Sequence, residues 1–515
     1  MRENRGKYSY KVLLGSHDSR LKKGPAREVV DYLYSRWLHA TLPAFEDLLT
    51  FLKAHLVELH DKKVIPRNDA RKILETLRWI QKKGIDHFEL DPSIEDLMPN
   101  IEAIVISKLG ESAGGKILTG MARGEPMYVS AILLLRRKIL DLLEEVYSLR
   151  KLIIALASRH TETIMPGYTH VQHAQPTTIG HYLACVAEAL ETDCTRFENA
   201  YQRVNMSPAG YSSAWGTSYP TDRRRVASFL GFDSVIENTR YAMLSFDRGI
   251  EALSALTILA IDINRFSDDL YFWCTFEFSM VDIADEYAST SYIMPQKKNP
   301  YALEEYPALV QRVCSEFFRV AELSRLVSFG LASHLSGKRT DITMTPSRII
   351  NDMIGAIRML RGMVSTLTIN EKVMRERAGI NFTQGTDLAD TLVREKGLSF
   401  RTAHRIIGVL VREAIRRKIR PSEINSEMLD HAAHEILGKP LKLASHRLLR
   451  ALDPMEGVRS RRGIGGVSPE AVRNSLKNRL KNLQEERDRL KKRKSQLRVA
   501  GKRLGTAVQR ICSIG

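Results

Sequence analysis

The sequence predicts an all-α protein built around long central helices. Apolar residues recur with the 3.6-residue period of a helix over long stretches, strand-like alternation is scarce, and loops rich in glycine, proline and serine separate the periodic stretches. With 43% hydrophobic and 27% charged residues, the composition is that of a globular protein. The 515 residues exceed one simple core, so about three subdomains are expected.

The predicted helices have apolar faces wide enough to be buried. They lie at residues 26–60, 128–160, 177–205, 247–275, 301–332 and 346–367, and shorter helices follow from about residue 368. Residues 92–110 form a connector that enters a further helix. Loops are expected at 114–126, 205–223, 289–300 and 336–346. Long helices joined by loops of this size favour a helical bundle whose loops bind a ligand.

The net charge of +18 is concentrated near the end of the chain. From Arg473 to Arg503, thirteen lysines and arginines stand against three acids. Leucine recurs every seventh position, at residues 476, 483, 490, 497 and 504. This pattern predicts a basic helix whose apolar stripe packs or associates weakly. Contact of its basic face with nucleic acid or another acidic surface is the alternative.

Several classes of protein are not expected. No apolar run is long enough to span a membrane, and residues 1–15 lack the apolar core of a secretion signal. The five cysteines are scattered, with no spacing typical of a metal site. We therefore expect reduced thiols, a cytoplasmic protein with no membrane contact, and neither a metal nor an organic cofactor.

Two loops carry the candidate chemistry. In STSYIMPQKKNP (289–300), Ser291, Lys297 and Asn299 could close over an anion, although a serine needs strong activation to act as a base. In MPGYTHVQHAQPT (165–177), four polar side chains cluster in a way that is costly to bury, namely Thr169, His170, Gln172 and His173. These residues alone allow either an anion-handling enzyme or a helical scaffold with an anion-binding loop.

Several motifs in fixed order resemble the argininosuccinate lyase family of the fumarase/aspartase superfamily. TSYIMPQKKNP (290–300) is similar to GSSxMPxKxNP, and GYTHVQHAQP (167–176) is similar to GYTHLQxAQP. Segments 208–223, 385–404 and 452–472 resemble three further family motifs, so the resemblance runs from about residue 90 to residue 475.

The resemblance implies a fumarase/aspartase-type three-domain fold with a central long-helix bundle. The expected divisions are an N-terminal helical domain (1–113), a central bundle with the catalytic loops (114–367), a small C-terminal helical domain (368–470) and a basic helical tail (471–515). Family members are homotetramers in which three subunits contribute to each active site. The tail is expected to be dispensable for chemistry.

The resemblance also implies an anti β-elimination that splits argininosuccinate, a small-molecule substrate, into arginine and fumarate. Ser291 is the expected general base, and Lys297 and Asn299 would hold the carboxylate and its developing charge. His170 would take part in proton transfer, paired with Glu304. Further residues expected to bind substrate are Thr169, Arg123, Gln172 and Gln296.

The chain departs from the family pattern at four places. Thr290 and Tyr292 replace a glycine and a serine of the signature loop. In TGMARGEPM (119–127), only Arg123 remains of the Ser-Arg-Asn trio that grips the substrate in the family's TGRSRNDQV. Residues 95–102 lack the histidine of the family motif, and 340–346 lack its substrate-binding glutamine and lysine. Two alternatives therefore stay open: a carbon–nitrogen lyase for another N-substituted aspartate, and a non-catalytic relative.

Overall fold

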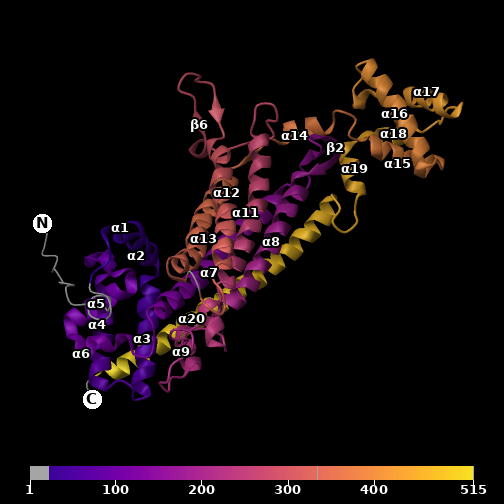
Figure 1. Cartoon of the computed structure of the whole chain (residues 1–515). Helices are drawn as coiled ribbons and strands as arrows, with labels where there is room; N and C mark the ends of the chain where they lie inside the picture. The colour runs from indigo at the N-terminus through magenta and orange to yellow at the C-terminus, as the bar shows by residue number, and fades with distance from the viewer. Residues whose placement is uncertain (1–22, 333–334, 514–515) are drawn as a thin grey trace.

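A bundle of long helices carries a small helical lobe at each end of the molecule (Figure 1). The structure is a computed structural model that describes residues 23–332 and 335–513. The mostly helical fold predicted from the sequence is confirmed. Residues 1–15, from which the absence of a secretion signal was argued, lie outside the described part of the chain.

The N-terminal lobe consists of short helices in close succession. They are α1 (Arg27–Val29), η1 (Val30–Tyr34), α2 (Ser35–Thr41), η2 (Leu42–Ala44), α3 (Phe45–Asp61), α4 (Arg67–Lys83), η3 (Ile85–His87), η4 (Pro92–Ile94), α5 (Leu97–Leu109), α6 (Glu111–Gly114) and η5 (Gly115–Leu118). The single apolar pattern predicted at 26–60 is therefore split into several pieces. One of the breaks, η2, contains Pro43, which removes a backbone donor.

Five long helices form the central bundle. They are α7 (Gly124–Arg159), α8 (Ile179–Val204), α11 (Asp247–Trp273), α12 (Tyr301–Arg325) and α13 (Leu335–Ser365). Helix α7 packs against α8 and α13, and α11 packs against α8, α12 and α13. The short helices α9 (Arg223–Leu230) and α10 (Thr239–Leu244) lie in the connection between α8 and α11. The observed bounds of α8 and α11 lie within two residues of the predicted ones.

The loop predicted at 336–346 is wrong, because this segment forms the first part of α13. Its threonines, aspartate and proline suggested a loop, but Ile342, Met344 and Thr345 are buried in the bundle. Packing of such side chains stabilises a helix that propensity alone would not. Pro346 fits inside the helix next to Gly249 of α11, whose missing side chain leaves room for the proline ring.

The loop predicted at 114–126 is also shorter than expected. Residues up to Leu118 are helical, and α7 begins at Gly124. The loop that remains, 119–123, joins the N-terminal lobe to the bundle and carries Arg123.

Four two-stranded ribbons interrupt the helices. β1 (Ile164–Thr169) and β2 (Gln172–Thr178) form an antiparallel hairpin, and β6 (Ser289–Thr290) and β7 (Lys298–Asn299) form another. The remaining pairs are β3 (Met206–Ser207) with β4 (Ser234–Val235), and β5 (Val281–Asp282) with β8 (Thr368–Ile369). Strands β3 to β8 have two residues each, too few to leave an alternating pattern in the sequence, and β1 and β2 each contain a proline, which is unusual inside a strand.

The second lobe has an apolar core of its own, centred on Leu392, Ile406 and Leu429. Its elements are α14 (Glu371–Ala378), α15 (Gly385–Lys396), α16 (Phe400–Arg416), η7 (Pro421–Glu423), α17 (Ser426–Leu437), α18 (Ser445–Leu452) and α19 (Pro454–Ser460). The domain divisions named above stay predictions.

The basic C-terminal stretch is a single helix, α20 (Pro469–Cys512), that runs back along the bundle to the N-terminal lobe (Figure 1). It packs against α7, α8, α9, α3 and α4. Leu476, Leu483, Leu490 and Leu504 of the predicted stripe are buried. Several of its basic side chains form ion pairs with acids of the same chain, such as Lys494 with Glu144. Contact of the exposed basic side chains with nucleic acid stays a prediction.

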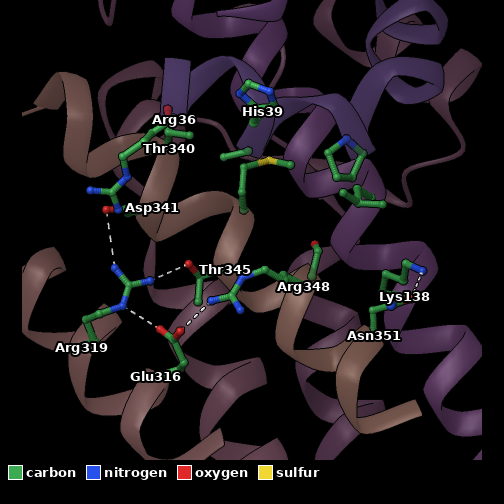
Figure 2. A pocket seen from close by; sticks show the side chains of 15 residues that line it. Arg36, His39, Lys138, Glu316, Arg319, Thr340, Asp341, Thr345, Arg348 and Asn351 are labelled. Atoms are coloured by element: carbon green, nitrogen blue, oxygen red, sulfur yellow. Dashed lines mark hydrogen bonds and ion pairs between the residues drawn. The ribbon is translucent and has the colours of Figure 1, made fainter. Parts of the chain in front are cut away.

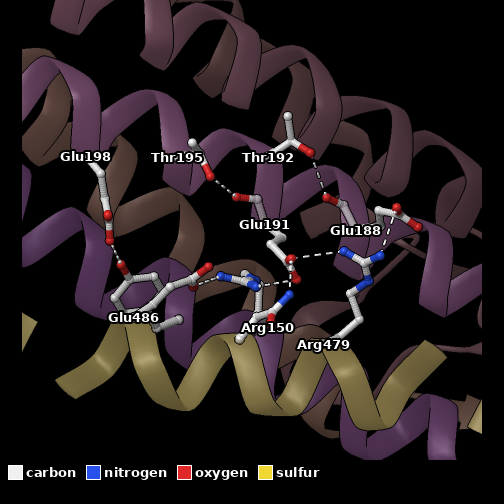
Figure 3. A network of polar contacts seen from close by, with 10 residues as sticks. Arg150, Glu188, Glu191, Thr192, Thr195, Glu198, Arg479 and Glu486 are labelled. Atoms are coloured by element: carbon white, nitrogen blue, oxygen red, sulfur yellow. Dashed lines mark hydrogen bonds and ion pairs between the residues drawn. The ribbon is translucent and has the colours of Figure 1, made fainter. Parts of the chain in front are cut away.

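A buried polar network joins α20 to the bundle (Figure 3). The guanidinium of Arg150, on α7, is fully buried between the carboxylates of Glu486 on α20 and Glu191 on α8. Arg479 of α20 donates to Glu191 and to Glu188, each over 2.9 Å. A buried cation is tolerated only when nearby acids compensate its charge, so this network stabilises the position of α20 on the bundle.

Candidate active site

The Thr-His motif lies at the tip of the β1–β2 hairpin. Thr169 and Gln172 pair across a two-residue turn formed by His170 and Val171. Both turn residues have positive φ, 54° and 59°, as a type I′ turn requires. Such turns favour Asn-Gly, and a β-branched valine at positive φ is strained. Backbone strain concentrates at functional sites, so this turn is consistent with a functional histidine at its tip.

Of the two histidines in this hairpin, His170 is the one that faces solvent. His173 packs edge-on against the ring of Tyr168, whose hydroxyl lies 3.5 Å from its Nε2 atom. Burial and the nearby Arg377 lower the pKa of His173, which favours its neutral form. His173 is therefore a packing residue, and His170 remains free to meet a ligand.

The signature loop projects from the bundle between β6 and β7 (Figure 1). The Ser291 hydroxyl oxygen accepts hydrogen bonds from the backbone amides of Ile293 and Met294, over 3.3 and 3.1 Å. These bonds place the serine at the start of a tight turn. Tyr292 and Ile293 are almost fully exposed, at 106% and 85%, which is unusual for large apolar side chains.

The polar residues that follow differ in their surroundings. Gln296 and Lys297 are exposed, and no ion pair involves Lys297 within the described residues. Lys298 instead pairs with Asp282 and Asp285, over 3.1 and 3.0 Å. The Asn299 amide lies 3.4 Å from the Ser289 hydroxyl, across the ribbon. Of the two adjacent lysines, Lys297 is therefore the one left for a ligand.

In the described part of one chain, predicted active-site residues from different elements are not joined by side-chain hydrogen bonds or ion pairs. Glu304 is exposed in the first turn of α12, and in the described part of the chain no hydrogen bond or ion pair joins it to His170. Side-chain bonds between Ser291, His170 and Arg123 are likewise absent from the described residues. In Figure 1, the ribbons β6 and β2 lie at the upper part of the bundle, whereas α6, shortly before Arg123, lies in the N-terminal lobe at lower left.

Arg123 lies where the N-terminal lobe meets the bundle. It forms ion pairs with Glu95 and Asp96, and its Nη1 atom is 3.5 Å from the Asp96 carboxylate. Asp96 also caps α5 by accepting a hydrogen bond from the Met98 amide. Burial raises the pKa of Asp96 to about 6. Arg123 faces a hollow of about 100 Å³ whose opposite wall is formed by α13, and Arg339 on that wall was not identified from the sequence.

Glu125, two residues after Arg123, holds the backbone of the loop at 208–212 in place. The buried carboxylate of Glu125 accepts hydrogen bonds from the backbone amides of Gly210 and Ser212, over 2.6 and 2.5 Å. Burial raises its pKa to about 7, opposed by these bonds and by nearby arginines. Each oxygen of this carboxylate therefore accepts a backbone hydrogen bond from the loop.

A second hollow, of about 680 Å³, lies between α2, α7, α12 and α13 (Figure 2). The charged side chains among its described lining residues are Arg36, Lys138, Arg319, Arg348, Glu316 and Asp341. Glu316 accepts from both Arg319 and Arg348, over 2.6 Å in each case. The two hollows meet at Thr340 and Met344, in the segment where the family's glutamine and lysine are replaced.

Among the described residues, no group of three or more histidine, cysteine, aspartate or glutamate side chains is placed to hold a metal ion. None of the described helices combines the length and apolar character needed to cross a membrane.

The chain matches two protein-family models. The model described as Lyase matches residues 37–315, and the model described as Argininosuccinate lyase C-terminal matches residues 382–459. Among curated proteins, the argininosuccinate lyase of Methanothermobacter thermautotrophicus is 37% identical over 420 residues, which cover 82% of this chain and 89% of that protein. The argininosuccinate lyase of Methanosarcina acetivorans is 36% identical over 466 residues, 89% of this chain and 91% of that protein.

Solved structures with the same fold include a crystal structure of EDDS lyase in complex with formate. It is 26% identical, has a TM-score of 0.82, and the match covers 97% of this chain and 99% of that one. A class II fumarase from Schistosoma mansoni superposes with a TM-score of 0.67 at 15% identity, covering 81% and 90% of the two chains, and shares the fold.

Proposed function

Because the chain belongs to the argininosuccinate lyase family, we propose that it cleaves argininosuccinate to arginine and fumarate, in arginine biosynthesis. The observation that carries this proposal is the identity of 37% with a curated argininosuccinate lyase over 82% of the chain, together with a serine, a lysine and an asparagine on the exposed signature loop.

In the proposed elimination, Ser291 removes a proton from the carbon next to a carboxylate of the succinyl group. The electron pair of that C–H bond becomes the new C=C bond of fumarate, and the C–N bond breaks with its electrons going to nitrogen. Lys297 and Asn299 stabilise the negative charge that develops on the carboxylate, because fixed donors need no reorganisation during the reaction. The leaving nitrogen takes up a proton from a general acid, a role that suits His170.

The remaining predicted residues bind and orient the substrate. Thr169 and Gln172 flank His170 in the hairpin, and Gln296 precedes Lys297 in the signature loop. Arg123 is placed to grip the part of the substrate that leaves. Closure of the signature loop would exclude water from the reacting atoms.

We further propose that the active enzyme is a cytoplasmic homotetramer whose sites combine residues of several subunits. Two observations support composite sites. The predicted residues lie on separate parts of one chain, and Tyr292 and Ile293 of the signature loop are exposed. Another copy of the chain would cover these apolar side chains and complete the site.

The first test is fumarate release from argininosuccinate, followed by ultraviolet absorbance and run beside adenylosuccinate, aspartate and other N-substituted aspartates. Release from argininosuccinate supports the proposal, and release from another substrate only contradicts it. A second test mixes the inactive variants Ser291→Ala and His170→Asn. Recovered activity in the mixed tetramers supports composite sites, whereas unchanged inactivity with confirmed mixing argues against them.

A second candidate is a carbon–nitrogen lyase that releases fumarate from a different N-substituted aspartate, with the same base and another amine. Two observations favour it: the likeness to EDDS lyase over 97% of the chain, and the loss of the family's glutamine and lysine from residues 340–346. The substrate panel decides between the two candidates.

A further inference from the structure

Two arginines from different elements face the same small hollow. Arg123 precedes α7 and Arg339 lies in the second turn of α13, and both line the cavity of about 100 Å³ together with Asp96. By the volume a buried water needs, this cavity holds several waters or one small polar group. An anion placed in this hollow would lie within reach of both guanidinium groups.

Arg339 forms no ion pair within the described residues. Its Nη2 atom donates to the hydroxyl oxygen of Tyr211 over 2.5 Å, and its guanidinium lies 5.8 and 5.9 Å from the ring centres of Tyr128 and Tyr211. Its Nε atom is buried and has no hydrogen-bond partner there. Glu125 and Asp96 lie close enough to Arg339 to interact with it electrostatically, but neither forms an ion pair with it. A half-buried guanidinium with unused donors is a suitable site for a carboxylate.

Arg123 differs from Arg339 because it already has acidic partners, Glu95 and Asp96. Its pKa is nevertheless lowered, first by burial and then by the proximity of Arg339. The positive charge of Arg339 therefore contributes to the lowered pKa of Arg123. An anion between them would relieve this repulsion.

The absence of a side chain at Gly124 leaves the space that the Arg339 guanidinium occupies in the hollow. A Cβ atom at position 124 would lie 2.0 Å from Nη1 of Arg339, so any other residue there would displace the guanidinium. In the related family motif an asparagine occupies this position. A glycine in place of that asparagine therefore removes a side-chain amide from the 119–127 loop and makes room for the guanidinium of Arg339 on α13.

The part of the substrate that would meet Arg123 and Arg339 follows from the other assignments. The groups proposed to bind the succinyl carboxylates, Lys297, Asn299 and Thr169, lie on the signature loop and the hairpin. This assignment leaves the Arg123–Arg339 hollow for the part of the substrate that departs with nitrogen.

We propose that Arg339 determines specificity by binding, together with Arg123, a carboxylate carried by the leaving amine. In argininosuccinate this carboxylate is the one on the arginine portion, and Asp96 would accept from its ammonium group. This inference rests on the proposed lyase function and adds a residue and a chemical requirement to it.

The experiment compares argininosuccinate with its agmatine analogue, which has the same guanidino link to succinate and lacks the carboxylate on the amine. In the wild-type tetramer, kcat/KM should favour argininosuccinate by about 10- to 100-fold, the value of one or two charge-assisted hydrogen bonds. Arg339→Gln should raise KM for argininosuccinate by that factor, leave kcat nearly unchanged, and leave the agmatine analogue unaffected. Arg358→Gln is the matched control, because Arg358 lies on the same helix and pairs with Glu145.

Gly124→Ala provides an independent variant. It should reproduce the effect of Arg339→Gln by displacing the guanidinium, and the double variant should lose nothing more than either single variant. Arg339→Lys, which keeps the charge but not the forked donors, should fall between wild type and Arg339→Gln, and serves if the glutamine variant does not fold. Equal losses for both substrates, or no loss for either, would overturn the proposal.

A binding measurement separates this proposal from the lyase function. Calorimetry on the intact wild-type protein should show L-arginine binding more tightly than agmatine, and Arg339→Gln should abolish the difference. That result supports the proposal even where no fumarate is released. Failure of fumarate release alone counts against the lyase function, whereas equal binding of arginine and agmatine to wild type counts against the role of Arg339.

Discussion

The guanidinium of Arg150 on α7 donates to the carboxylate of Glu486 on α20, a residue 336 positions further along the chain. Arg150 is fully buried, so Arg150→Met leaves Glu486 buried and unpaired. We expect a loss of about 3–5 kcal/mol in the free energy of unfolding. Chemical denaturation at fixed protein concentration measures this loss.

The control for this variant is Arg203→Met, which removes an exposed ion pair with Glu251 and should cost about 1 kcal/mol or less. The double variant Arg150→Met/Glu486→Leu should regain most of the lost stability, since Arg479 still pairs with Glu191. A single variant as stable as wild type would show that the network does not hold α20 in place. Truncation before Pro469 should unfold the bundle, contrary to the expectation that the tail is dispensable.

Ser291→Ala should lower kcat for fumarate release by about 10²- to 10⁴-fold, the usual contribution of a general base. The helical circular dichroism should not change, because the loop is exposed. Ser365→Ala, which alters an exposed serine at the end of α13, is the control. Undiminished turnover in Ser291→Ala would remove Ser291 from the role of base.

His170→Asn should keep the hairpin and lose activity. Asparagine tolerates the positive φ of this turn but cannot transfer a proton at neutral pH. We therefore expect an unchanged unfolding temperature and a kcat at least 100-fold lower. Retained turnover would assign the histidine a structural role.

Val171→Gly should stabilise the protein by about 1 kcal/mol. Removing the strain of a β-branched residue at φ 59° gains about 1–3 kcal/mol, and the added freedom of the unfolded chain offsets part of this gain. Thermal unfolding measures the change. A lower unfolding temperature would mean that neighbouring contacts of Val171 matter more than its backbone strain.

Glu102 should make stability depend on pH. Burial raises its folded-state pKa to about 7, above the unfolded value near 4.5, so the native state binds the extra proton between these values. Its contribution is fully present below pH 4.5 and is lost as pH rises through 7, a fall of about 3 kcal/mol. Urea unfolding between pH 5 and 8 should show this fall in wild type and a flatter profile in Glu102→Gln. Identical slopes would rule out Glu102 as the titrating group.

The long helices could be predicted from the sequence because their periodicity is local. The bounds of α8 and α11 follow from it within two residues, and the leucine stripe of α20 was identified in the same way. The first turns of α13 were missed because buried contacts of Ile342 and Thr345, distant in sequence, override a composition typical of loops.

In the candidate site too, residues in local motifs could be predicted from the sequence, whereas residues that depend on distant contacts could not. Ser291 and His170 lie in compact motifs whose polar residues are adjacent in sequence, so the sequence locates them. Arg339 could not be found in this way, because its role depends on the space that Gly124 leaves more than 200 positions earlier. The pairing of Glu304 with His170 stays a prediction, since it needs contacts that one chain does not contain.

The return of α20 along the bundle has a consequence for biosynthesis. The helices that it covers, α3, α4, α7, α8 and α9, are all translated before it. Until α20 emerges from the ribosome, the surface that receives Leu476, Leu483 and Leu490 is exposed to water, and the carboxylate partner of Arg150 from α20 is missing. The nascent bundle is thus incomplete and prone to aggregate until one late helix docks, so translation that stops before α20 should yield a substrate for chaperones and proteases.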